Sequence, residues 1–137
     1  MADSIKKARN FRNYKVWQDA VSYATHIYMV TNEMPWFEKK GLCDQLQRAA
    51  VSISSNIAEG CAKPSDAEFA KFLDTALGSA YEVETQLLIA KNIGYISDND
   101  DDNDDENVGR SSYQRLFEEL QSIEKQIVGL IRSIRCD

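Results

Sequence analysis

The sequence predicts an all-α protein that folds as an antiparallel up-and-down four-helix bundle. In four segments, apolar residues recur at steps of three and four, the period of an amphipathic helix. The only two prolines, Pro35 and Pro64, fall between these segments. Short connections between the first three helices favour antiparallel neighbours. We therefore predict one domain over residues 1–137, with a basic arm at 1–10 and an acidic loop at 97–109 between the third and fourth helices.

The stretch from Gly41 to Gly60 predicts the central helix of this bundle. Apolar side chains recur at steps of three or four residues and form one stripe: Leu42, Leu46, Ala49, Ile53 and Ile57. Small side chains flank this stripe, namely those of Ala50, Ser52, Ser54, Ser55 and Ala58. Because small side chains let neighbouring helices approach, we expect this helix to pack on more than one side.

The first helix is predicted from Tyr14 to about Met34. Its expected buried face consists of Trp17, Ala20, Val21, Ala24, Ile27, Tyr28 and Thr31. Pro35 disfavours helical geometry at Met34 and ends the helix there. The next residues, Trp36 and Phe37, are expected to cap the end of the core. His26 lies beside the buried face, which predicts a surface or helix–helix histidine with a satisfied hydrogen bond.

The third helix has clear start and stop signals. Ser65 can act as N-cap, and Glu68 three residues later completes a capping box. Gly94 is suited to terminate the helix, at about Ile93, in the left-handed conformation. The side chains expected to face inward are Phe69, Phe72, Leu73, Ala76, Leu77, Ala80, Leu87 and Leu88.

The fourth helix, from about Ser111 to Arg135, has the most regular pattern in the chain. Its seam alternates steps of three and four through Tyr113, Leu116, Leu120, Ile123, Ile127, Leu130 and Ile134. Phe117 and Ile131 widen the apolar face beyond that of a two-stranded coiled coil, as a bundle requires.

The net charge of −6 hides an uneven distribution. Residues 98–106 hold seven of the 22 acidic residues, so the rest of the chain has 16 basic and 15 acidic side chains. Five basic residues lie within the first fifteen positions and are our candidates for nucleic-acid binding: Lys6, Lys7, Arg9, Arg12 and Lys15. A near-neutral body is thus expected to carry a basic arm and an acidic loop.

The acidic stretch fails the test for an EF-hand. A loop that starts at Asp98 puts Asn103 where glycine is needed and Gly109 where a bidentate glutamate is needed. We predict a solvated, self-repelling linker, and a cation-responsive role for residues 98–106 stays open as an alternative.

Other site classes lack their sequence signals. A di-metal carboxylate bundle needs two Glu-x-x-His motifs, but the chain has one histidine, preceded at that spacing by Tyr23. We predict no metal and no cofactor. The three cysteines have no C-x-x-C spacing, and neither a signal peptide nor a membrane-spanning run is apparent. These features predict reduced thiols in a cytoplasmic protein.

Polar residues on the two central helices form a candidate network. Arg48, Ser52 and Asn56 follow at i, i+4 steps and share a face. The full candidate set is Arg48, Asn56, Glu59, Glu82 and Glu84. We favour an interhelical or intersubunit network, with Arg48 paired to a glutamate across the interface. The alternative is an enzyme with a polar site around Asn56 and Glu59.

Several long segments resemble the bacterial four helix bundle protein family, which includes proteins encoded in intervening sequences of large-subunit ribosomal RNA genes. The segments are FRNYKVWQDA, DQLQRAAVSISSNIAEG, KPSDAEFAKFLDTALGSAYEVETQLLIAKNIGYI and GLIRSI, which together cover most of residues 11–135. They also resemble the accessory variability determinant of diversity-generating retroelements. This resemblance implies an antiparallel four-helix subunit that assembles into a homo-pentameric ring, and relatives in retroelements bind nucleic acid and a reverse transcriptase through a basic surface.

Together these observations predict a noncatalytic, self-assembling accessory module, not an enzyme, that binds nucleic acid, a protein partner or both. The acidic insertion is expected to repel phosphate backbones near it, whereas the arm can supply a positive surface.

Overall fold

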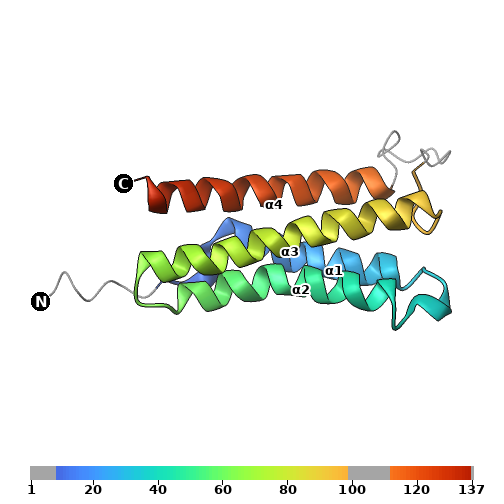
Figure 1. The fold of residues 1–137 in the computed structure, drawn as a ribbon, viewed down its shortest axis with the longest axis horizontal. Helices are drawn as coiled ribbons and strands as arrows, with labels where there is room; N and C mark the ends of the chain where they lie inside the picture. The colour runs from blue at the N-terminus through green and yellow to red at the C-terminus, as the bar shows by residue number, and fades with distance from the viewer. Residues whose placement is uncertain (1–8, 99–111, 137) are drawn as a thin grey trace, which may run out of the picture.

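The computed structural model describes residues 9–98 and 112–136, and in these ranges it is an antiparallel four-helix bundle without strands. Figure 1 shows the helices side by side along one long axis. They are α1 (Lys15–Thr31), α2 (Leu42–Cys61), α3 (Asp66–Asn92) and α4 (Ser112–Arg135), and two 3-10 turns, η2 (Phe11–Asn13) and η3 (Trp36–Glu38), flank α1. The predicted fold class is therefore confirmed.

The local signals around α3 act as the sequence predicts. The backbone N–H of Glu68 donates to Ser65 Oγ at 3.2 Å, which satisfies one of the free donors at the helix N-terminus. At the other end, Gly94 adopts a φ of 84°, the left-handed geometry that ends many helices. Both boundaries fall within one residue of their predicted positions.

The small residues of α2 allow close packing against α3. A Cβ added at Gly60 would lie 2.8 Å from Phe72 Cβ and 3.0 Å from Phe69 Cδ1. On its other side, α2 contacts α1, where Gln47 Nε2 donates to Thr31 Oγ1 at 2.9 Å. The expectation that α2 packs on more than one side is confirmed.

Aromatic contacts attach the segment before α1 to the bundle. The Phe11 and Trp17 rings are 5.0 Å apart in an edge-to-face arrangement. Tyr14 makes a similar contact at 6.0 Å with Phe69 of α3. These contacts join the start of α1 to the start of α3.

Trp36 and Phe37 do not cap the core, so that prediction was wrong. Their side chains are 85% and 61% exposed because η3 turns them outward. Met34, Cys43 and Ile96 are among the residues buried at this end of the bundle. Apolar character alone does not tell which side of a short turn a residue occupies.

Three residues assigned to buried helix faces are also exposed: Val21, Tyr28 and Leu88. The predicted buried faces were too wide, because only a narrower stripe of side chains on each helix packs into the core. On α1 the narrower stripe includes Ala20, Tyr23 and Ile27, none of which is accessible to solvent. The exposed residues lie at the edges of these stripes.

Candidate functional site

Arg9 of the basic arm is held by the bundle. Its Nη1 donates to the Lys63 carbonyl oxygen at 2.9 Å, its Nη2 pairs with Asp66, and its guanidinium lies 4.6 Å from the Phe69 ring centroid. The side chain is only 15% exposed. Arg9 therefore attaches the arm to the α2–α3 connection and offers little of its charge to a ligand.

The other described candidates for nucleic-acid binding are accessible. Arg12 is exposed, and its guanidinium lies 4.5 Å from the Phe11 ring centroid. Lys15 is 74% exposed, with its Nζ 2.6 Å from Asp19 Oδ2. Lys6 and Lys7 lie outside the described residues.

The fold brings further basic residues to the end of the bundle where the arm attaches. Helices α1 and α3 begin there, and α2 and α4 end there (Figure 1). Lys63 lies in the α2–α3 connection and Lys71 in the second turn of α3. Arg132 and Arg135 lie in the last turn of α4, and Arg135 Nη2 is 2.6 Å from Asp74 Oδ2. Sequence reasoning missed these residues because they are far from the arm along the chain. Their positions near predicted helix ends were the available signal.

The acidic stretch is attached at the opposite end of the bundle. Asp98 follows α3 and Ser112 begins α4, and the Tyr113 N–H donates to the Ser97 carbonyl at 3.1 Å. Helix α3 has 27 residues and is about 40 Å long at 1.5 Å per residue. The predicted acidic loop at 97–109 lies mostly outside the described residues. Its two attachment points are nevertheless about 40 Å from Arg9 along the bundle.

Near the predicted polar residues, a serine pair links α2 and α3, and Asn56 bonds within α2. Ser52 Oγ lies 2.8 Å from Ser79 Oγ, and Asn56 Nδ2 donates to the Ser52 carbonyl at 2.8 Å and to Ser52 Oγ at 2.9 Å. Arg48 instead pairs with Asp44 one turn earlier on its own helix, at 3.0 Å. Among the described residues of this subunit, Arg48 makes no pair with a glutamate.

The three glutamates of the candidate set lie in different surroundings. Glu59 and Glu82 are exposed on α2 and α3, and the structure does not bring them together with Asn56. Glu84 instead neighbours Glu124 of α4. Burial and the Glu84 carboxyl raise the pKa of Glu124 to about 7. Sequence reasoning missed Glu124, although its place beside the α4 seam, four residues after Leu120, was a usable signal.

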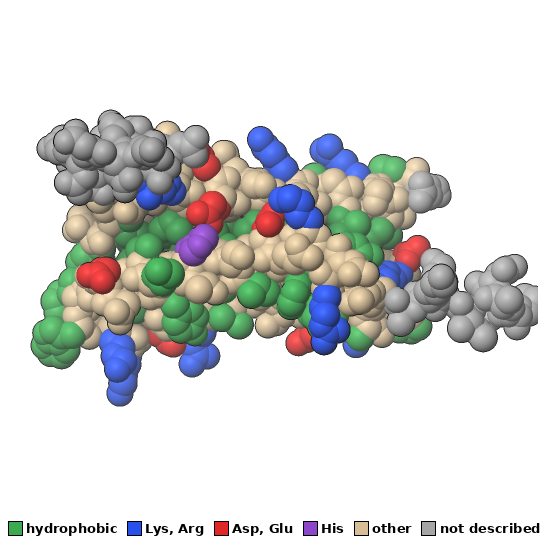
Figure 2. All heavy atoms as spheres, turned by 180° about the vertical axis from the view of Figure 1, so that it is seen from behind, with side chains coloured by type: hydrophobic (Ala, Val, Ile, Leu, Met, Phe, Trp, Pro, Cys, Tyr) green, Lys and Arg blue, Asp and Glu red, His purple; other side chains and the backbone are tan. Residues whose placement is uncertain are grey.

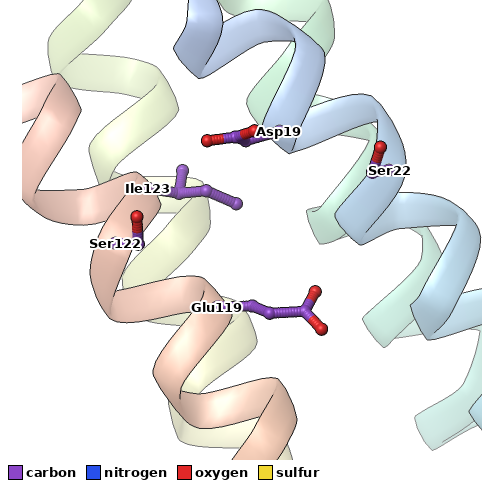
Figure 3. Close-up of a pocket in the computed structure, with 5 residues that line it drawn as sticks. All are labelled: Asp19, Ser22, Glu119, Ser122 and Ile123. Carbon is purple, nitrogen blue, oxygen red and sulfur yellow. The ribbon is translucent and has the colours of Figure 1, made fainter.

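A shallow groove runs between α1 and α4, with a volume of about 270 Å³, and its lining residues are Asp19, Ser22, Glu119, Ser122 and Ile123 (Figure 3). Both carboxylates in it are already engaged. Gln126 Nε2 donates to Asp19 Oδ2 at 2.9 Å, and His26 Nδ1 lies 2.8 Å from Glu119 Oε2. The predicted surface histidine with a satisfied hydrogen bond is thus confirmed, and the groove is a polar seam between two helices.

One exposed apolar face lies on α1 and α2. The hydrogen bond between Gln47 and Thr31 shows which sides of the two helices meet. Val21 and Tyr28 lie seven residues apart and share one side of α1, while Val51 follows one turn after Gln47 on α2. In the view of Figure 2, hydrophobic side chains gather along the lower half of the molecule and at one end.

A second exposed apolar face lies on α3 and α4. Tyr81 and Leu88, also seven residues apart, are 50% and 44% exposed. Tyr81 lines a groove of about 400 Å³ together with Val128 and Gly129 of α4. The two apolar faces therefore use different pairs of helices.

The cysteines form no disulfide. Cys43 and Cys61 are buried, and burial raises the pKa of both thiols, whereas Cys136 is exposed. In the described part of the chain, none of the helices combines the length and apolar character needed to cross a bilayer.

Comparison with known proteins shows a family and a fold that this chain shares. The model of a family described as 23S rRNA-intervening sequence protein matches residues 12–129. Among solved structures, the chain is similar to a protein of unknown function from the S23 ribosomal protein family of Bacteroides thetaiotaomicron. The two are 24% identical with a TM-score of 0.71, and the match covers 85% of this chain and 98% of that chain. This likeness supports the fold alone. None of the curated proteins matches this chain.

Proposed function

Because the chain belongs to the 23S rRNA-intervening sequence protein family, we propose that it is a noncatalytic accessory module of the cytoplasm that self-assembles and binds nucleic acid. Binding takes place at the end of the bundle that carries the basic arm. The observation that carries this proposal is the distance of about 40 Å along the bundle axis between Arg9 and the attachment points of the acidic stretch.

The separation removes the main objection to nucleic-acid binding. The acidic stretch is attached about 40 Å from Arg9, as the length of α3 indicates. The Debye length is about 8 Å at physiological salt, so the effect of a charge at these attachment points is screened over the distance to Arg9. Arg12, Lys63 and Lys71 can then attract phosphates locally, together with the arm.

The experiment that tests this proposal is fluorescence anisotropy with labelled ribosomal RNA fragments at several salt concentrations. The variant Lys6→Ala/Lys7→Ala should weaken binding and reduce the slope of log affinity against log salt by about 0.7 per lost contact to single-stranded RNA. The matched control is Lys39→Ala/Lys40→Ala, which removes two adjacent lysines from the η3 end. Equal losses in the two variants, or no binding at low salt, would contradict the proposal.

Self-assembly is supported by the two apolar faces. Val21, Tyr28 and Val51 lie on α1 and α2, whereas Tyr81 and Leu88 lie on α3 and α4. A contact between two different faces of successive copies is heterologous and closes into a ring when the rotation permits. We propose such a ring, and the family resemblance makes a homo-pentamer the expected size.

A protein partner is a second candidate, favoured by the exposed aromatic pair at the η3 end. Trp36 and Phe37 contact each other edge-to-face at 6.0 Å and are the two aromatic side chains most exposed in the described structure. Exposed tryptophan is enriched at protein–protein interfaces. Loss of partner capture on Trp36→Ala with unchanged RNA binding would support this second role.

A further inference from the structure

Two contacts fix how α3 and α4 lie against each other. Arg135 pairs with Asp74 near one end of the helix pair, and Lys91 Nζ lies 5.1 Å from the Tyr113 ring centroid near the other. Because the helices are antiparallel, these contacts set the middle of α3 against the middle of α4. In this antiparallel register, position 84 of α3 lies opposite position 124 of α4.

Glu84 and Glu124 meet in this region, and neither carboxylate can supply a hydrogen-bond donor when ionised. Glu124 Oε2 is buried, and no donor in the described structure reaches it. Glu84 is the carboxyl group whose hydrogen bond and charge raise the pKa of Glu124. A proton held between the two groups provides the missing donor and removes the repulsion between two like charges.

The other groups around the pair do not neutralise it. From α1, the Tyr23 hydroxyl is buried and no acceptor in the described structure pairs with it; burial and the nearby negative charges of α3 and α4 raise its pKa. Glu119 of α4 adds a further negative charge near Tyr23. Lys125 and Arg132 line the groove beside Glu124, but neither forms an ion pair with it in the described structure.

We propose that Glu84 and Glu124 share one proton and thereby make the docking of α4 on α3 a pH-sensitive clasp. With the shared proton, the pair is a hydrogen bond between helices. Without it, two adjacent carboxylates repel across a partly buried contact, and α4 opens more often. This inference concerns the fold of one subunit and does not depend on nucleic-acid binding or self-assembly.

Hydrogen exchange of backbone amides at pH 6 and pH 8 tests the clasp, with rates corrected for the intrinsic effect of pH. The protection of amides in the middle of α4 should fall roughly three- to tenfold between these pH values, since one proton is released over this range. Amides in the middle of α2, which contacts α1 and α3, serve as the internal reference. In Glu124→Gln, which keeps a donor at all pH values, the fall in α4 should disappear.

The matched control is Glu82→Gln, the same chemical change at an exposed position two residues before Glu84. This variant should retain the fall seen in the natural protein. Unchanged α4 protection between pH 6 and pH 8, or an equal fall in Glu124→Gln, would overturn the proposal. NMR titration of the side-chain carboxyl carbons gives a second readout in the natural protein. One of the two carboxyls should titrate near neutrality, and titration of both near pH 4 would overturn the proposal equally.

Discussion

Gly60 of α2 lies so close to Phe72 of α3 that a Cβ at position 60 would be 2.8 Å from the Phe72 Cβ. Contacts this short between carbon atoms are repulsive, and both atoms belong to packed helices that cannot move independently. The approach of α2 to α3 therefore depends on the absence of a side chain at this position.

We expect Gly60→Ala to destabilise the protein by about 1–2 kcal/mol, measured by urea unfolding. Overpacking costs about 1–3 kcal/mol, and the better helix propensity of alanine offsets up to about 1 kcal/mol of this. Gly78→Ala is the matched control, because nothing lies within 4 Å of a Cβ there. That variant should be stabilised by up to about 1 kcal/mol, and equal effects of the two substitutions would refute the close-packing account.

Arg9 and Arg12 are close in sequence but should differ in effect. Arg9→Ala removes the contacts to Lys63, Asp66 and the Phe69 ring, so it should lower the free energy of unfolding by about 1 kcal/mol. Arg12→Ala should leave stability nearly unchanged and reduce the salt dependence of RNA binding. Thermal unfolding and anisotropy on both variants separate the roles. A larger loss of RNA affinity in Arg9→Ala than in Arg12→Ala, with no loss of stability, would reverse the assignment.

The pH dependence of stability should report on Glu124. Its pKa is raised to about 7 in the folded protein by burial and by Glu84, above the unfolded value of about 4.3. The stability linked to its proton is fully present below about pH 4 and is lost as pH rises through about 7. Because the side chain is only partly buried, solvent screening reduces the effect to about 1 kcal/mol.

Urea unfolding of Glu124→Gln should therefore match the natural protein at pH 4 and exceed it by about 1 kcal/mol at pH 8. The comparison between the two proteins cancels the contributions of other titrating groups. A constant difference at both pH values would show that Glu124 does not titrate in this range.

Local patterns in the sequence predicted most of the fold. The capping residues Ser65 and Gly94 and the regular seam of α4 depend on neighbours within a few positions, so their boundaries could be read directly. The side of a helix edge or turn that faces solvent depends on helices far along the chain. For this reason Trp36 and Leu88 were assigned to the core although both are exposed.

The candidate sites were less predictable for the same physical reason. The role of Arg9 is decided by Lys63 and Asp66, which are 54 and 57 residues away along the chain. The pairing of Glu84 with Glu124 depends on the register of two helices joined by the acidic stretch. Charge patterns showed which residues could bind phosphates, and the fold showed which of them are already engaged.

The most direct test of the central claim is the absolute mass in solution, measured by light scattering on the protein alone and with an RNA fragment. We predict a mass near five times 15.5 kDa for the protein and a higher mass with RNA at low salt that returns to the first value at high salt. A mass of 15.5 kDa at micromolar concentration, unchanged by RNA, would contradict both self-assembly and nucleic-acid binding.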